Sequence, residues 1–277
     1  MRYVFFGTPD FAAVILEKLI KAGFVPEAVV CNSDKPIGRK KIITPPPTKI
    51  SAQKYNIPVL QPEILANHKS QITNYKPDLF IVAAYAKIIP EEILKIPRLG
   101  VIGVHPSLLP KHRGPSPIQS VILSGEAETG ATLFLADEKA DHGLIFAQRK
   151  LEFSILNSQF LKLQQSLAEL GGDLLIETLP KFIKGEIIPL PQDESHATYT
   201  KKFITEDGYV DLQKNEPTVI ERKIRAFNPE PGVWTMMEIK SEKKRVKLLE
   251  SELVDGRLKL TKIQVEGGKP QDICRII

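Results

Sequence analysis

The stretch Asp78–Ala84, DLFIVAA, is a continuous apolar run behind one acidic residue, and it decides the fold class of the chain. An apolar run without polar alternation predicts a strand covered on both faces, as in the centre of a parallel sheet. Similar runs recur at Tyr3–Phe6 and Val101–Val104, and helical patterns occupy 11–22 and 90–95. Strands that alternate with helices predict right-handed crossovers and an α/β, Rossmann-like fold with a mostly parallel sheet.

The rest of the chain extends this pattern and then changes character. Further strands are predicted at 28–31, 59–60, 129–135, 144–151, 246–249 and 258–263, and helices at 48–55, 158–184 and 218–227, with a break near Gly171 and Gly172. Prolines and acidic residues replace the helical period at 187–194, which predicts a linker. We therefore expect one domain over 1–186, a linker over 187–198 and a small β-rich domain over 199–277.

Composition narrows the class of protein. The 277 residues, 42% hydrophobic and 26% charged, are typical of a soluble globular chain of about two domains. The sequence has no apolar run of about 18 residues and no signal peptide before its first strand, so we expect a cytoplasmic protein without membrane contact. Cys31 and Cys274 lack metal-binding spacing, which predicts reduced thiols and no metal site. A net charge of +5 fits either a polyanionic partner or an ordinary basic surface.

The end of the first strand argues against a nicotinamide or flavin cofactor. It reads Gly7-Thr8-Pro9 and lacks the G-x-G-x-x-G loop that lets a backbone approach a pyrophosphate. Because one fold hosts many functions, the layout alone does not decide the activity.

The stretch Gly100–Gly114, GVIGVHPSLLPKHRG, joins a strand to a proline-bounded loop that carries His105. An isolated histidine after a strand is more often structural than catalytic, and Asp141 by itself is typical of a turn before Gly143. Ligands, however, bind at the carboxyl ends of strands in open α/β sheets, which is where this loop falls.

Seven separate segments together resemble the methionyl-tRNA formyltransferase family. They are FFGTPDFA at 5–12, SDKPIGR at 33–39, AAYAKIIP at 83–90, the stretch 100–114, GEAETGA at 125–131, ADEKADHG at 136–143 and AFNP at 226–229. The resemblance spans nearly the whole chain. It implies an enzyme of translation initiation that moves the formyl group of 10-formyltetrahydrofolate to the α-amino group of methionine on initiator tRNA. It also implies a catalytic N-terminal domain and an OB-like C-terminal domain that binds tRNA.

The resemblance also implies roles for individual residues. His105 would orient the formyl group and stabilise its developing charge, and Asp141 would position His105 and assist proton transfer. Gly103 stands where the family carries an asparagine whose amide can bind the formyl oxygen. Loss of one such donor typically costs roughly 2.7–4 kcal/mol of transition-state stabilisation. A water in the vacated space, or another donor such as His142, could replace it; His142 is otherwise read as an exposed turn residue.

Two binding regions follow from the same resemblance. The folate-binding residues would be Ser107, Leu108, Leu109 and Pro110, with Ala84, Tyr85 and Ile88 beside the pteridine; core packing is the competing role for both leucines. The tRNA-binding residues would be Lys35, Arg39, Lys40 and Lys41 in an irregular, exposed basic loop that also includes Lys49. The run KKRVK at 243–247 could follow the RNA backbone. We expect a monomer.

Two other functions stay open on sequence grounds. A transferase of the same fold could formylate a sugar amine or another small amine, although the basic loop and the C-terminal region disfavour this. A weakened homologue that binds tRNA or folate without turnover is the second alternative, and Gly103 is the reason to keep it.

Overall fold

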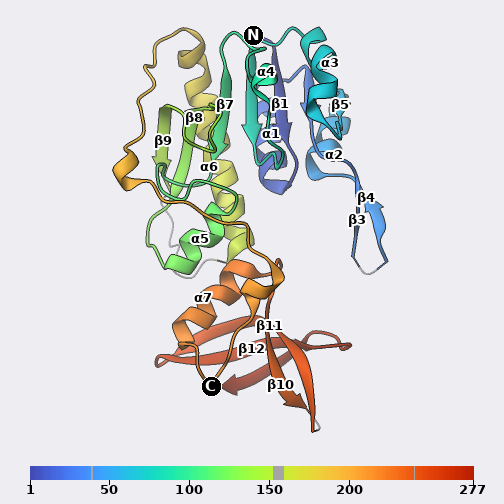
Figure 1. The fold of residues 1–277 in the computed structure, drawn as a ribbon, viewed down its shortest axis with the longest axis vertical. Helices are drawn as coiled ribbons and strands as arrows, with labels where there is room; N and C mark the ends of the chain where they lie inside the picture. Colours follow the sequence, from blue (N-terminus) through green and yellow to red (C-terminus); the bar gives the residue numbers. More distant parts are fainter. Residues whose placement is uncertain (39, 152–158, 240) are drawn as a thin grey trace. The chain divides into compact units, whose positions relative to one another are not determined.

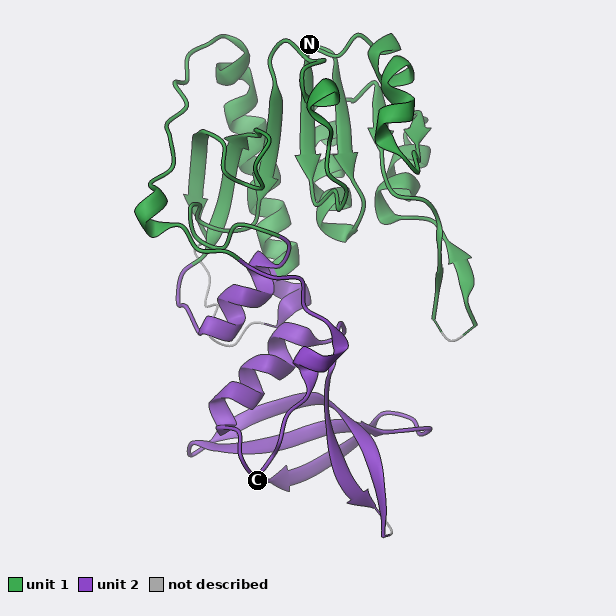
Figure 2. Ribbon diagram, in the orientation of Figure 1, with its two compact units in different colours: residues 1–114, 129–152, 164–199 green, residues 115–128, 153–163, 200–277 purple. Residues whose placement is uncertain are grey.

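A computed structural model describes residues 1–38, 40–151, 159–239 and 241–277. Its chain forms two compact units (Figure 2). Unit 1 comprises Met1–Gly114, Thr129–Glu152 and Gln164–Tyr199, and unit 2 comprises Pro115–Glu128, Phe153–Leu163 and Thr200–Ile277. Compactness does not show which part would fold alone, so the domain limits at 1–186, 187–198 and 199–277 stay a prediction.

Unit 1 contains the α/β part of the chain (Figure 1). Its strands are β1 (Tyr3–Gly7), β2 (Ala28–Val30), β3 (Lys35–Ile37), β4 (Ile42–Thr44), β5 (Val59–Leu60), β6 (Leu79–Ala83), β7 (Val101–His105), β8 (Gly130–Leu135) and β9 (Ile145–Lys150). Its helices are α1 (Asp10–Lys21), α2 (Pro47–Lys54), α3 (Lys69–Asn74), α4 (Glu91–Leu94) and most of α6 (Phe160–Ile183).

The main sheet has the order β5-β2-β1-β6-β7-β8-β9. The pairs from β5 to β7 are parallel, and β8 and β9 continue the sheet antiparallel. This arrangement confirms the predicted mostly parallel α/β sheet. The chain proceeds from β1 to β2 on one side and later to β6 on the other, so the strand order reverses at β1. Ligands bind at the carboxyl edge near such a reversal.

Helices cover both faces of the sheet. On one face, Ile72 of α3 and Ile93 of α4 belong to a buried cluster with Phe6, Phe80 and Val101 of the strands. The other face is covered by α1, which contacts β1 and β6, and by α6, which reaches Val104 of β7. The central strands are therefore buried on both sides, which explains their continuous apolar sequence.

Helix α6 runs unbroken from Phe160 to Ile183, so the predicted break at Gly171 and Gly172 was wrong. A Cβ added at Gly171 would lie 2.8 Å from Val104 Cγ1 of β7, and one at Gly172 would lie 2.9 Å from Lys18 Cδ of α1. The glycines therefore let α6 approach the sheet and α1 closely. Residue 158, the predicted helix start, lies outside the described residues.

The basic segment that we expected to be irregular forms a hairpin. Strands β3 and β4 pair antiparallel, with Lys35 opposite Thr44 and Ile37 opposite Ile42. Both strands are largely exposed. Sequence reasoning missed the hairpin because its strands are short and one contains a proline, which weakens strand signals.

The predicted linker is also more ordered than expected. Leu190 exchanges both backbone hydrogen bonds with Ile145 of β9, each 2.8 Å long. The Arg113 amide donates to the Thr198 carbonyl at 2.9 Å. Residues 190–199 thus pack into unit 1 by pairing with β9 and with the loop after β7.

Unit 2 carries the small β-rich part of the chain. Its elements are α5 (Pro117–Ser124), α7 (Pro217–Phe227), β10 (Val233–Ile239), β11 (Glu242–Val254), β12 (Arg257–Val265) and β13 (Gln271–Ile276). The strands form one antiparallel sheet in sequence order. Helix α7 begins with a proline at its first turn and buries Ile220, Ile224 and Phe227, and it packs on β11 and β12.

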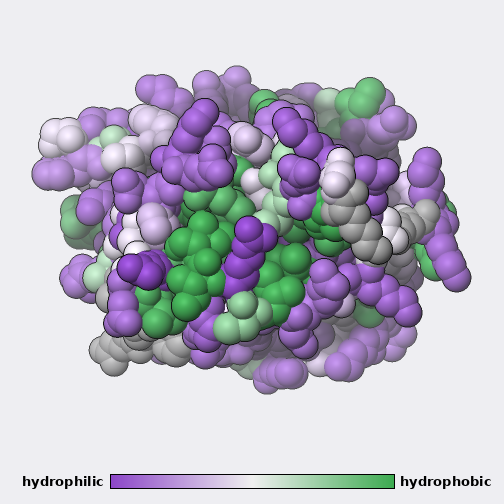
Figure 3. Space-filling view, turned by 90° about the horizontal axis from the view of Figure 1, so that it is seen from below, coloured by the Kyte–Doolittle hydropathy of each residue, from purple (hydrophilic) through white to green (hydrophobic). Residues whose placement is uncertain are grey.

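No described helix has both the length and the apolarity to cross a bilayer. The face shown in Figure 3 is mostly hydrophilic, with a small group of hydrophobic residues near its middle. Because apolar atoms contribute much of the surface of any folded protein, a small group of this kind is ordinary.

Candidate active site

His105 is the last residue of β7, at the carboxyl edge of the sheet, and only 5% of it is exposed. Its Nε2 lies 2.9 Å from the carbonyl oxygen of His112. A carbonyl can only accept, so Nε2 carries a hydrogen, and in the neutral ring Nδ1 is the unprotonated nitrogen. The loop after β7 therefore fixes the tautomer of His105.

The unprotonated nitrogen of this imidazole, Nδ1, is directed at Asp141. His105 Nδ1 lies 3.7 Å from Asp141 Oδ1. With a neutral ring and an ionised carboxylate, both groups are acceptors and make no hydrogen bond to each other. One added proton makes Nδ1 a donor and the ring a cation, so the contact becomes an ion pair. The arrangement is suited to accepting a proton.

The backbone of Asp141 adopts the left-handed conformation, with φ of 52°. Its Oδ2 accepts a hydrogen bond of 2.7 Å from the Gly114 amide, which stabilises the carboxylate. Gln192 Nε2 donates to the carbonyl oxygens of Asp141 at 2.9 Å and Gly143 at 2.8 Å. Asp141 is thus held from both its side chain and its backbone.

Phe134 fills the space beside Gly103. The two residues lie opposite each other in the β7–β8 pair. A Cβ added at Gly103 would lie 2.3 Å from Phe134 Cε1 and 2.4 Å from its Cζ. An aromatic ring from the neighbouring strand therefore occupies the space beside the glycine, which disfavours a water as the replacement donor.

The predicted folate segment after β7 is fastened to β8. Thr132 Oγ1 donates to the Ser107 carbonyl at 2.7 Å and accepts from the Leu109 amide at 3.1 Å. Ser107 is fully buried, and its hydroxyl donates to the Lys111 carbonyl. Leu109 is buried, whereas Leu108 and Pro110 are partly exposed. Of these residues, Leu108 and Pro110 offer apolar surface to a ligand.

The predicted pteridine wall follows β6, the parallel neighbour of β7. Ala84 is exposed, and Ile88 is 91% exposed. Tyr85 packs edge-on against the Phe6 ring, with centroids 5.5 Å apart. Burial raises the pKa of Tyr85 to about 12, and its hydroxyl is buried without a hydrogen-bond partner. The hydroxyl therefore stays protonated and is directed into the protein rather than to solvent. Both predicted folate segments lie at the same edge of the sheet.

The predicted tRNA residues lie on the β3–β4 hairpin. Lys35, Lys40 and Lys41 are exposed there, whereas Arg39 lies outside the described residues. Lys49 differs from these lysines, because its Nζ lies 2.8 Å from Asp34 Oδ2 and also donates to Gln61. Lys49 is therefore less available to a polyanion than the sequence indicated.

The basic run in β11 is only partly available to a polyanion. Arg245 lies over the Trp234 ring, 4.0 Å from its centroid, and Lys244 pairs with Glu242 at 2.9 Å. Lys243 and Lys247 are exposed.

His142 belongs to a polar contact network. Its Nδ1 lies 2.7 Å from Asp137 Oδ2, and its Nε2 lies 3.6 Å from Glu194 Oε1. Carboxylates therefore face both ring nitrogens, which supports the interpretation as a turn residue over a role as replacement donor.

Sequence reasoning missed Arg113, Gln192 and Glu194. Arg113 is fully buried, and its guanidinium binds both carboxylate oxygens of Glu194 and the side-chain oxygen of Gln192. The one sequence feature that could have indicated Arg113 is its charge inside the proline-bounded loop. Gln192 and Glu194 had no signal, because they lie in a stretch that reads as a linker.

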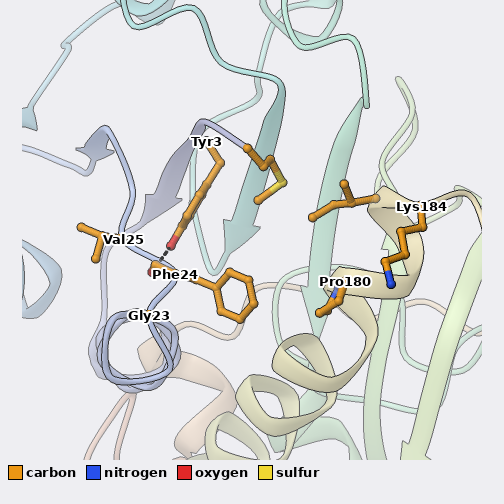
Figure 4. Close-up of a pocket in the computed structure, with 8 residues that line it drawn as sticks. Tyr3, Gly23, Phe24, Val25, Pro180 and Lys184 are labelled. Atoms are coloured by element: carbon orange, nitrogen blue, oxygen red, sulfur yellow. Dashed lines mark hydrogen bonds between the residues drawn. The ribbon is translucent and has the colours of Figure 1, made fainter.

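A hollow of about 500 Å³ lies at the opposite edge of the sheet (Figure 4). Tyr3, at the start of β1, contributes to its lining with Phe24 and Pro180. This hollow is separate from the His105 edge. Within the described residues, no three His, Cys, Asp or Glu side chains group as a metal site would require.

Comparison with known proteins relates both parts of the chain to formyl transferases. The family described as "Formyl transferase" matches residues 1–179, and "Formyl transferase, C-terminal domain" matches 202–257. A methionyl-tRNA formyltransferase of Chloroflexus aurantiacus is 43% identical over 237 residues, which are 85% of this chain and 76% of that protein.

Solved structures share the fold at low identity. HypX from Aquifex aeolicus, in complex with tetrahydrofolic acid, aligns with a TM-score of 0.68 and 19% identity; the alignment covers 98% of this chain and 46% of HypX. The sugar 3N-formyl transferase WlaRD aligns with a TM-score of 0.61 and 20% identity over 100% of this chain and 98% of its own. The chain thus spans about half the length of HypX.

Proposed function

Because this chain belongs to the methionyl-tRNA formyltransferase family, we propose that it transfers the formyl group of 10-formyltetrahydrofolate to the α-amino group of methionine on initiator tRNA. It is a formyl transferase by family, and the folate donor and tRNA acceptor are the substrates proposed here. Such an enzyme would act in the cytosol at translation initiation.

The reaction needs an electrophile, a proton acceptor and stabilisation of an oxyanion. The methionine nitrogen forms a bond to the formyl carbon, the bond from that carbon to N10 of the folate breaks, and one amine proton ends on N10. Negative charge develops on the formyl oxygen in between, and fixed donors aimed at that oxygen lower the barrier.

The observation that carries the proposal is the buried His105 imidazole with Asp141 at its Nδ1. The pair takes the amine proton, since that proton turns a contact between two acceptors into an ion pair. The protonated ring then presents a positive charge to the formyl oxygen, and the proton leaves with N10. The Gly114 amide keeps the carboxylate oriented throughout.

A flat pteridine needs apolar walls and a few fixed polar groups. The partly exposed Leu108 and Pro110 and the exposed Ile88 supply apolar surface at the His105 edge. These properties support folate binding at this edge.

The lysines of the β3–β4 hairpin support a polyanionic acceptor. Lys35, Lys40 and Lys41 lie exposed near Ile42 and Ile43, which are also exposed. Exposed cations can contact phosphates, and apolar side chains can contact riboses and bases. A nucleotide-linked amino sugar also carries phosphates, so the acceptor comparison below is needed to separate the two substrates.

The test is an acceptor comparison with purified protein and 10-formyltetrahydrofolate. Methionyl initiator tRNA and a nucleotide-linked amino sugar are offered separately, and N-formylated product is measured. We expect formylmethionyl-tRNA. Formylated sugar alone would assign the chain to the sugar-amine class, and binding without product would assign it to the non-catalytic class. The expected monomer stays a prediction, testable by sedimentation.

A further inference from the structure

The side chain of Gln192 occupies a position that admits one orientation of its amide. Its Oε1 accepts from Arg113 Nε at 3.0 Å and Nη2 at 2.8 Å. Its Nε2 faces the carbonyl oxygens of Asp141 and Gly143. Guanidinium only donates and carbonyls only accept, so a flipped amide would lose all four contacts.

Arg113 in turn is anchored by Glu194. Its Nη1 lies 3.0 Å from Oε2 of Glu194, and its Nη2 lies 2.6 Å from Oε1, as in a two-pronged ion pair. Tyr199 Oη accepts from Nη1 at 3.0 Å. The hydrogen bond from Arg113 holds the pKa of the half-exposed Glu194 carboxyl below its usual range. The buried guanidinium is therefore charged, paired and fixed.

These contacts end on the backbone that carries Asp141. A left-handed backbone costs free energy at a residue other than glycine, although less at aspartate than at most residues, and surrounding contacts then hold it in place. At Asp141 two hydrogen bonds hold this conformation. The Gln192 side-chain amide donates to the Asp141 carbonyl, and the Gly114 backbone amide donates to the Asp141 carboxylate. If the Gln192 contact is lost, the backbone can relax and the carboxylate turns away from His105.

We propose that Gln192, anchored through Arg113 to Glu194, is a positioning residue that holds the Asp141 carboxylate against His105. Gln192, Arg113 and Glu194 would then support the catalytic pair, whereas their neighbour Asp193 would not. This inference rests on the formyl-transfer function proposed above, and it adds residues that touch neither substrate. Positioning errors of about 1 Å can cost about a hundredfold in rate, which sets the scale of the expected effect.

The variant Gln192→Glu tests the two hydrogen bonds that the Gln192 Nε2 group donates. It keeps the oxygen that faces Arg113 and places a second oxygen against two carbonyl oxygens. We expect kcat to fall about 10- to 100-fold, with KM for both substrates changed by no more than about twofold, because geometry is lost and binding surface is kept. The Gly114 amide should exchange its hydrogen faster in the same variant, because its acceptor is no longer fixed.

The matched control is Asp193→Asn. Asp193 is the neighbouring carboxylate, and its side chain contacts Ser195 and His196 of its own turn. This variant should keep wild-type kcat and wild-type exchange at Gly114. An equal loss of kcat in both variants would mean that any disturbance of the segment reduces activity, and would overturn the proposal.

The remaining outcomes are also decisive. Wild-type kcat and Gly114 exchange in a folded Gln192→Glu variant would contradict the inference. If that variant does not fold, Glu194→Gln tests the same anchor from its exposed end, and unchanged kcat there would contradict it. If wild-type protein transfers no formyl group, the proposed function fails, and Gly114 exchange in Gln192→Glu still decides the positioning role.

Discussion

Replacing Gly103 by asparagine should not restore a donor while Phe134 stays in place. The added Cβ would lie 2.3 Å from Phe134 Cε1, closer than real Cβ contacts come, so the ring must move. Phe134 is only 5% exposed, which leaves it little room. Overpacking of this kind typically costs about 1–3 kcal/mol. We therefore expect Gly103→Asn to destabilise unit 1 by about that amount and to gain little rate.

Shortening the opposing ring should change the result. In Gly103→Asn combined with Phe134→Leu, the amide can enter the space that the ring occupied. One oxyanion donor is worth roughly 2.7–4 kcal/mol, so kcat should rise about a hundred- to a thousandfold over Phe134→Leu alone. Gly103→Ala is the matched control, because it makes the same clash without an amide.

The assay is a full mutant cycle, with formylation rate and urea-induced unfolding measured on each variant. A full rate gain by Gly103→Asn alone, without loss of stability, would refute the steric argument. A folded double variant without a rate gain would show that the missing amide does not limit this enzyme.

Three other properties can be predicted from the structure. The pKa of Glu194 lies below its ordinary value of 4.5, so its contribution to stability is complete above that pH and is lost as the pH falls through the lowered pKa. Urea unfolding of wild type and Glu194→Gln should thus differ at pH 7 and converge in acid; a constant difference would contradict this. Burial raises the pKa of Cys31 to about 11, so iodoacetamide at pH 8 should label the exposed Cys274 first by mass spectrometry, and equal labelling would count against the burial. Combined Lys40→Ala and Lys41→Ala should make the salt dependence of tRNA binding shallower by up to about 1.8 in log–log slope and spare folate affinity, whereas an unchanged slope would remove the hairpin from the contact.

Much of the fold was predictable because its signals are local. The apolar runs at 3–6, 78–84 and 101–104 correspond to buried strands β1, β6 and β7. Family motifs also pointed to His105 and Asp141, which the structure brings to 3.7 Å of each other.

The errors came from tertiary contacts that a sequence pattern does not contain. Gly171 was read as a helix breaker, yet it lies where α6 meets Val104. Gly103 was read as leaving a vacant space, yet Phe134 on the next strand fills it. Gln192 lies in the predicted linker, and no local pattern indicates its contact with the Asp141 carbonyl, 51 positions away in the chain.

The central claim is that His105 and Asp141 act together in formyl transfer, and single-turnover formylation of methionyl initiator tRNA tests it most directly. Wild type is compared with His105→Ala and Asp141→Asn at saturating 10-formyltetrahydrofolate. We predict losses of about 10²–10⁴-fold in each variant, because each removes half of one proton-accepting pair. A folded variant of either residue that formylates at the wild-type rate would contradict the account.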